Sequence, residues 1–453
     1  MKKLTQALVM AGLISLAGSA LAEGPKRGLL EIYQQAQARD SAWASARSAH
    51  AATQEKLVQG RALLMPTVTL ESNASHTDVE TKYVGSGANP FSGGKETFDG
   101  YDYSLNVNQP LFRWQNNVQY EQAKIQVAQA DYVLSASRLD LMQRTSQAYF
   151  DVLLAQDKID LIVAQKAATT RQLEQAKANF EVGTSTITDV HEAQSRYDLL
   201  LAQEIATINE LEIKKRAIQA IISDMPGPLA SAKESLNVVI PQPQEMEGWV
   251  EIAEAQNPQL AVQQHALQIA NKDVDRANAG HYPTLDAVAS YTESYSDGGV
   301  NGIGSDQQNT TVGLQLKIPL FEGGSTSSKS REAVANQQKA REDLEQIRRT
   351  IDLQTRQAYL NVASAVAQVK AYEQALTSSQ SSLDSTNLGY EVGVRTSVDV
   401  LNSQQQLFSA KRDLLQARYT WLLSVIQLKA AAGVLTEKDL EETNASLQLS
   451  DAK

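Results

Sequence analysis

The sequence contains no cysteine. Structural disulfides are therefore excluded, and an exported protein without them must bury a large core or oligomerise. Beyond the leader described next, no segment approaches the roughly 18–20 uninterrupted apolar residues that a transmembrane helix needs. If the processed chain enters a membrane, it must do so through β-strands.

The first residues have the pattern of a secretory leader. Lys2 and Lys3 give a basic start, an apolar stretch follows, and residues 20–22 read ALA, a small-x-small cleavage site. We therefore predict a signal peptide over 1–22, too short to span a membrane. Glu23 would be the new amino terminus, which excludes a lipid-modified cysteine at that position.

Basic residues are fewer than acidic ones, and the formal net charge is −11. A chain this acidic is a poor candidate for binding the phosphates of a nucleic acid. It is better suited to staying hydrated over most of its surface. No nucleic-acid partner is therefore expected.

Recognisable catalytic motifs are also missing. The five histidines are scattered, and the His191–Glu192 pair lacks the second histidine of an HExxH zinc site. No glycine-rich phosphate loop ends in Lys-Ser or Lys-Thr. The segments beginning at Asp297 and Gly304 could form a calcium loop, but turn chemistry in a surface loop explains their glycines better. We expect neither an enzyme nor a bound metal or cofactor.

Glycine and proline are absent from two long stretches, Leu111 to Val182 and Ser325 to Leu388. Both are rich in good helix formers, and at about 1.5 Å per residue each would form a helix on the order of 100 Å long. A seven-residue apolar repeat runs along the first stretch in two adjacent seams, Ile125, Tyr132 and Leu139 beside Val127, Leu134 and Leu141. Two seams suit a helix packed between two neighbours in a multi-helix wall. A lone coiled-coil stalk or filament is the alternative.

Short motifs of the first half recur in the second at a constant spacing. EVGTSTITDV at 181–190 returns as EVGVRTSVDV at 391–400, and Gln-Ala-Tyr at 147–149 returns at 357–359. The repeated unit is too long for a solenoid, whose repeats span about 20–50 residues. The chain is therefore two copies of one structural plan.

Each copy of the decapeptide marks a hairpin tip. Gly183 and Gly393 are placed as C-terminal caps of the long helices. Thr186 and Thr396 each stand three residues before an aspartate, as in a capping box that starts a returning helix. The predicted tips are 183–188 and 393–398, and the predicted return helices are 189–223 and 399–432.

Alternation of apolar and polar residues precedes each long helix. It covers 101–109 in the first half and 309–318 in the second, and it predicts strands with one apolar face. Their partner strands are expected at 67–79 and 284–296. Four strands cannot close a membrane barrel, and lipid does not tolerate open edges, so several chains would have to pool their strands. Two soluble hairpins packed on the helices are the alternative.

The predicted fold is mainly α with a small β part. The first repeat is predicted over 23–225, with a helix over 29–62 before its strands, and the second over 249–433, with a helix over 249–280. The long helices are predicted over 111–182 and 325–388. A linker over 226–248 joins the repeats, and the polar residues 434–453 are expected to form a partly disordered tail.

These features together resemble the TolC family of outer-membrane exit ducts, in its non-lipidated branch. The resemblance covers essentially the whole processed chain, and residues 389–440 are its most specific part. It implies a homotrimer in which three chains pool four strands each into a twelve-stranded barrel, continuous with a periplasmic barrel of helices. It also implies a place in outer-membrane lipid of a Gram-negative envelope, extending into the periplasm.

The resemblance further implies a role in type I protein secretion, multidrug efflux or both. The duct would conduct passively and would be gated at its periplasmic tip. Its partners would be a periplasmic adaptor (membrane fusion) protein and an inner-membrane ABC exporter or proton-driven pump, which supplies the energy. The exported substrate is not identified by these residues.

Gating residues of the family correspond to individual positions here. Asp189 matches the acid that holds the closed tip through a hydrogen bond to a tyrosine, matched by Tyr390. Thr188 and Arg395 match a second link. Asp399 matches an acidic ring at the constriction, and Asn402 stands where the founding member has a second acid, which implies weaker cation selectivity. The adaptor-docking tips correspond to Val182, Gly183, Thr186, Val392, Gly393 and Thr396.

Each of these assignments has a simpler competitor. Asp189 and Asp399 could act only as helix caps, a role compatible with the other. Arg395 could be an exposed charge at a turn, and Tyr390 could serve simple packing. For the whole chain, the rival is a periplasm-spanning or surface coiled-coil protein with small β-hairpin heads and no pore.

Overall fold

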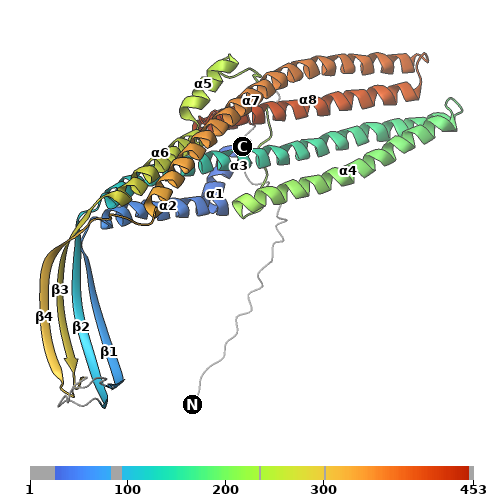
Figure 1. Ribbon diagram of the computed structural model, residues 1–453. Helices are drawn as coiled ribbons and strands as arrows, with labels where there is room; N and C mark the ends of the chain where they lie inside the picture. Colours follow the sequence, from blue (N-terminus) through green and yellow to red (C-terminus); the bar gives the residue numbers. More distant parts are fainter. Residues whose placement is uncertain (1–25, 83–93, 234–235, 300–301, 448–453) are drawn as a thin grey trace, which may run out of the picture.

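The computed structural model describes residues 26–82, 94–233, 236–299 and 302–447. Within them the molecule is elongated, with a β-sheet at one end, two helical hairpins at the other and long helices between them (Figure 1). The predicted signal peptide over 1–22 lies outside the described residues. So do residues 448–453 of the predicted tail.

Four antiparallel strands form one sheet in the order β1-β2-β3-β4. They are β1 (Thr67–Glu80), β2 (Lys95–Phe112), β3 (Thr284–Ser296) and β4 (Ser305–Lys317). β2 and β4 begin earlier than the alternation indicated, because backbone pairing with β1 and β3 continues through the polar segments after 94 and 304. The central pair, β2 with β3, joins the two halves of the chain. The outer edges of β1 and β4 have no strand partner among the described residues.

The register of the sheet separates an apolar from a polar face. Leu70 faces Leu105 on β2, which in turn faces Tyr291 on β3. Because directly opposed residues point to the same side of a sheet, these rungs lie on one face. The exposed apolar members of that face are Val68, Leu70, Tyr101, Tyr103, Leu105, Tyr291, Tyr295, Val312, Leu314 and Leu316.

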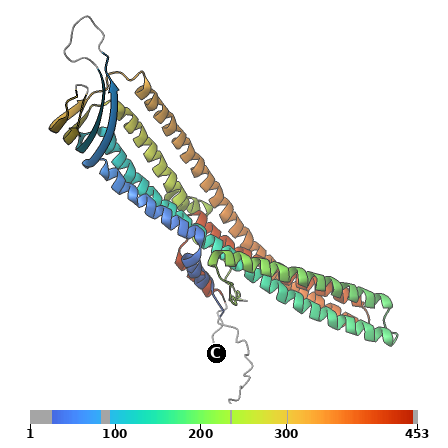
Figure 2. The ribbon, with the colours of Figure 1, turned by 90° about the horizontal axis from the view of Figure 1, so that it is seen from below.

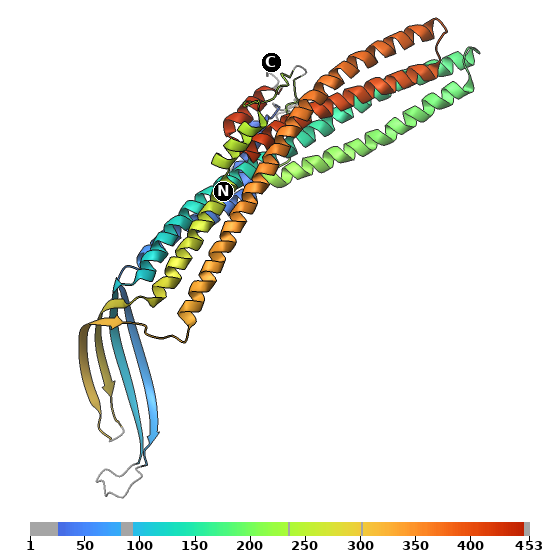
Figure 3. The same ribbon diagram turned by 45° about the horizontal axis from the view of Figure 1, so that its top comes forward.

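Two antiparallel helical hairpins form the other end of the molecule. The first consists of α3 (Trp114–Glu181) and α4 (Ile187–Ile222), and the second of α7 (Ser325–Glu391) and α8 (Ser397–Ala431). At about 1.5 Å per residue, α3 and α7 are each on the order of 100 Å long. The two hairpins lie side by side and end at the same level, with α3 next to α8 (Figures 2 and 3).

Each helix predicted before the strands is in fact two helices. The first prediction, 29–62, is wrong at Asp40, which separates α1 (Leu29–Arg39) from α2 (Ser41–Ala62) and accepts a hydrogen bond from the Trp43 amide at 2.7 Å. The second, 249–280, is broken at Asn257, whose side chain accepts from the Gln259 amide at 2.8 Å. This break separates α5 (Met246–Gln256) from α6 (Pro258–Asn278). In both cases a side-chain cap restarts the helix in a new direction.

The expected polar tail is also partly wrong, because residues 437–445 form the helix α9 (Glu437–Ala445). Leu440 is fully buried, and Lys429 of α8 donates a hydrogen bond to Asp439 at 2.5 Å. Burial of one leucine and this ion pair anchor a segment whose composition is otherwise polar. Midway along the molecule, α9 packs against α1 beside the main apolar core, which includes Tyr149, Phe150 and Tyr419.

Among the described residues, no helix combines the length and the hydropathy needed to cross a membrane.

Candidate functional site

Both hairpin tips turn through a glycine with left-handed backbone. Gly183 has φ +78° and Gly393 has φ +81°, a region that other residues enter only with strain. Each glycine follows an exposed valine, and the side chains of Val182 and Val392 are 73% and 66% exposed. Val394 is 75% exposed as well. The tips therefore present apolar side chains to the surroundings.

Capping boxes start both return helices. The Asp189 carboxylate accepts from the Thr186 amide at 3.1 Å, and the Asp399 carboxylate accepts from the Thr396 amide at 2.9 Å. The Ser185 hydroxyl holds the pKa of Asp189 below its usual range, and the Thr396 amide does the same for the pKa of Asp399. Both aspartates thus act as ionised helix caps, whatever further role they have.

The tyrosine of the predicted gate has a different partner within one chain. The Tyr390 hydroxyl accepts a hydrogen bond from Asn179 Nδ2 at 3.0 Å, which joins α7 to α3. Among the described residues, no hydrogen bond joins Asp189 to Tyr390 or Thr188 to Arg395. Thr188 and Arg395 are both exposed at the tips. Both links of the gate stay predictions.

Gly389 places Arg395 against the end of α7. The amide of Arg395 donates to the Gly389 carbonyl at 3.1 Å. A Cβ on Gly389 would lie only 2.6 Å from Cγ of Arg395, a distance that would force the arginine to shift. The sequence-based reasoning missed both Gly389 and Asn179. These two residues occupy equivalent positions in the two repeats but differ in type. A comparison of the two tips position by position could have found them.

Three further hydrogen bonds join the hairpins and were not predicted. Gln172 on α3 donates to the Ser397 hydroxyl on α8 at 3.1 Å, and both side chains are buried. Arg196 on α4 donates through Nη2 to Asn402 Oδ1 on α8 at 3.1 Å, and through Nη1 to Gln405. Asn402 is exposed, one helical turn after Asp399. Asn402, predicted at the constriction, is therefore bonded to the neighbouring hairpin of the same chain.

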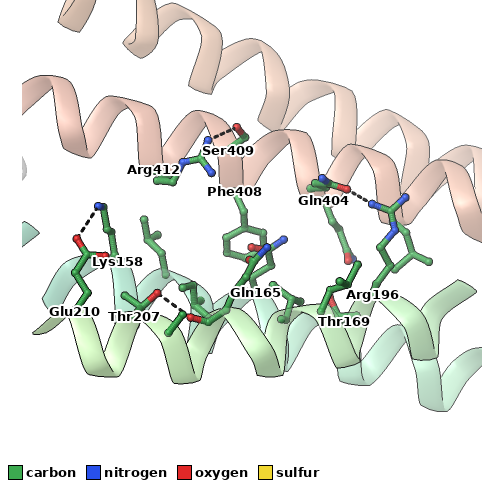
Figure 4. Close-up of a pocket in the computed structure, with 18 residues that line it drawn as sticks. Lys158, Gln165, Thr169, Arg196, Thr207, Glu210, Gln404, Phe408, Ser409 and Arg412 are labelled. Carbon is green, nitrogen blue, oxygen red and sulfur yellow. Dashed lines mark hydrogen bonds and ion pairs between the residues drawn. The ribbon is translucent and has the colours of Figure 1, made fainter. Parts of the chain in front are cut away.

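A cavity of about 520 Å³ lies between α3, α4 and α8. In Figure 4, Arg196 lies at one end and the Lys158–Glu210 ion pair at the other, while Phe408 of α8 projects into the middle. Apolar side chains of α4 and charged groups at both ends line the same space. We call this space the groove between the hairpins.

A buried polar pair connects α3 and α8 farther from the tips. Tyr419 donates to the Asp157 carboxylate at 2.5 Å. Burial raises the pKa of Asp157, while the bond from Tyr419 opposes that shift. Burial also raises the pKa of Tyr419. The hydroxyl therefore stays protonated and serves as the donor.

Comparisons with known proteins match both halves of this architecture. The model of the outer membrane efflux protein family matches residues 32–223 and 249–434. The chain is 33% identical to outer membrane protein TolC of Vibrio cholerae, over 99% of each chain. It is also 31% identical to the alkaline protease secretion protein AprF of Pseudomonas aeruginosa, over 91% of this chain and 86% of that protein.

A solved structure gives an independent comparison of the fold. The outer membrane protein VceC of Vibrio cholerae superposes with a TM-score of 0.74 and covers 89% of this chain and 96% of its own. Sequence identity in that comparison is 19%, so the similarity supports the arrangement of strands and hairpins alone.

Proposed function

This chain belongs to the outer membrane efflux protein family, and from that premise we propose that three copies form a gated duct from the periplasm to the cell exterior. Proteins of this family are outer-membrane channels of efflux and secretion rather than enzymes. The chain is accordingly an efflux and secretion channel of the outer membrane that extends into the periplasm. The proposal concerns its assembly, its gate and its partners.

The sheet is the observation that supports a barrel built from the strands of several chains. It has an exposed apolar face, as lipid requires, and an opposite face with polar residues that include Glu71, Asn73 and Asp102. Its strands exceed the roughly 9–11 residues that a tilted membrane strand needs. The free edges of β1 and β4 cannot remain unpaired in lipid. Pairing β4 of one copy with β1 of the next, three times, closes a barrel of twelve strands.

Exposed apolar residues on the helices support the same assembly. Leu199, Ile205 and Ile208 on α4 and Leu353 and Leu360 on α7 are each more than half exposed in one chain. Contact with neighbouring copies would remove these side chains from water. Such burial stabilises an assembly by roughly 25 cal/mol per Å² of apolar surface. The helices of three copies would then form the wall of one periplasmic tunnel.

The gate is proposed at the tips of the hairpins. The predicted Asp189–Tyr390 and Thr188–Arg395 links would hold the α7–α8 hairpin inward, with Asp399 at the constriction. A periplasmic adaptor would dock on the exposed valines and in the groove between the hairpins. An ABC exporter or a proton-driven pump in the inner membrane would supply the energy. Similarity to a protein named for alkaline protease secretion supports a type I secretion role.

Purification in detergent followed by recording in planar bilayers tests this function. We expect a trimer by light scattering and discrete ion-conducting events. A protein that stays monomeric and soluble without detergent, and conducts nothing, would instead support the poreless stalk. The two outcomes differ in both mass and conductance, so one preparation decides between them.

A further inference from the structure

Arg196 reaches from one hairpin to the other. Its Nε donates to Glu192 at 3.0 Å, one turn earlier on α4, while Nη2 donates to Asn402 at 3.1 Å and Nη1 donates to Gln405. The bond to Glu192 orients the planar guanidinium so that both terminal nitrogens face α8. Figure 4 shows this side chain spanning the space between the two helices.

A second arginine on the same helix provides a contrast. Arg216 donates to Glu212, again four residues earlier, at 2.9 Å, but its remaining bond goes to Gln219 of α4 itself at 3.0 Å. Each arginine therefore forms the same kind of ion pair, with a glutamate four residues earlier on α4. They differ in that Arg196 connects two hairpins, whereas Arg216 bonds within a single helix.

The acceptors of Arg196 are neutral amides on two exposed residues. A hydrogen bond from a charged donor to a neutral acceptor is stronger than a neutral pair but weaker than a buried ion pair. Such bonds can hold two helices together and still release when a partner protein pulls them apart. Aspartate at position 402 would turn this contact into an ion pair and tighten it.

We propose that Arg196 is a latch that holds the α7–α8 hairpin against α4 and so opposes opening of the duct, with Asn402 and Gln405 as its acceptors. The inference rests on the proposed gated channel. It gives residue 402 a role that differs from the constriction ring implied by resemblance. Residue 402 acts on the gate through Arg196, and not as a charge facing the permeating ions.

Bilayer recordings of Arg196→Gln and Arg216→Gln test the latch. We expect Arg196→Gln to raise the open fraction roughly threefold to tenfold, as for loss of one or two modest hydrogen bonds. Arg216→Gln, which removes the same charge from the same helix, should match the unchanged protein. Equal behaviour of the two variants would overturn the latch. Absence of any conductance in the unchanged protein would instead overturn the channel function itself.

A double-mutant cycle separates the latch from a ring of charge. Asn402→Asp should lower the open fraction when Arg196 is present and should have no effect on it when residue 196 is glutamine. Ion selectivity should change little in either background. A shift toward cation selectivity of the same size in both backgrounds would mean that residue 402 faces the ions, and would overturn the proposal.

Cross-linking reports the contact directly, because the chain has no native cysteine. Arg196→Cys combined with Asn402→Cys, treated with a short reducible bis-methanethiosulfonate, should form a bridge within one chain and lower the conductance until it is reduced. The control pair is Arg216→Cys with Asn402→Cys, which should not bridge. Linked dimers or trimers on a denaturing gel would place residue 402 against a neighbouring subunit and would overturn the latch within one chain.

Discussion

Arg113 holds Asp286 through both carboxylate oxygens where the sheet meets the helices. Nε donates at 2.7 Å and Nη2 at 2.5 Å. The Asp286 side chain is only 5% exposed, whereas that of Arg113 is 39% exposed. Arg113 directly follows β2 at the N-cap position of α3, and Asp286 lies on β3. The pair therefore fixes the direction in which α3 leaves the sheet.

Arg113→Ala should destabilise the protein by about 2–4 kcal/mol, because it leaves a buried carboxylate without its partner. Arg113→Lys should destabilise the protein less than Arg113→Ala, since lysine keeps the charge but cannot bond to both carboxylate oxygens at once. Thermal unfolding of the detergent-solubilised protein measures the effect. Arg349→Ala is the control, because its pair with Glu345 is exposed and should contribute less than about 1 kcal/mol. If the two alanine variants unfold alike, the junction does not depend on this pair.

The tip tyrosine yields a second prediction. Tyr390→Phe with Arg395→Ser should raise single-channel conductance, because it removes both predicted links of the gate. Asn179→Ala should reproduce the tyrosine part of that effect, since Asn179 is the residue that donates to the Tyr390 hydroxyl. Planar bilayer recordings compare these two variants with the unchanged protein. Unchanged conductance in the double variant would remove Tyr390 and Arg395 from the gate.

Gly389→Ala should act on the gate through Arg395. The added methyl would meet Cγ of the arginine at 2.6 Å, so the side chain must move away from the end of α7. We expect a rise in conductance similar to that of Arg395→Ser, and no further rise when the two changes are combined. Gly313→Ala is the control, because open space surrounds that position. Additive effects of the two changes at the tip would show that Gly389 acts by another route.

The sequence alone predicts those features that depend on residues close together along the chain. The tips followed from Gly183 and Gly393, which the turn geometry needs, and the strands from period-two alternation. The breaks at Asp40 and Asn257 were missed because both lie in helix-favouring sequence, although Asn257-Pro258 carried a cap signal.

Contacts between distant elements could not be predicted in the same way. Arg196 is an ordinary i,i+4 partner of Glu192 in the sequence, and only packing brings α8 within its reach. The docking of α9 depends on one buried leucine, Leu440, in a polar segment. In both cases the deciding partner lies far along the chain, where neither periodicity nor propensity gives a signal.

Asp157 yields a prediction about pH. Burial raises its pKa above the ordinary aspartate value of 3.8, so the native state binds a proton more readily than the unfolded chain. Stability should therefore increase as the pH falls from neutral toward the raised pKa, and this gain should be complete below 3.8. The caps Asp189 and Asp399 have lowered pKa values, so they should lose their contribution only at more acid pH. The two effects have opposite signs on opposite sides of the ordinary carboxylate value.

Asp157→Asn separates these contributions, because the amide oxygen can still accept the hydrogen bond from Tyr419. We expect this variant to lose the gain in thermal midpoint between neutral pH and about pH 4, and to keep the loss below that value. Asp160→Asn is the matched control, since Asp160 lies one turn along the same helix and is exposed. Asp160→Asn should keep most of the rise in thermal midpoint between neutral pH and about pH 4. If Asp157→Asn and the unchanged protein show the same profile above pH 4, another buried group governs that part of the curve.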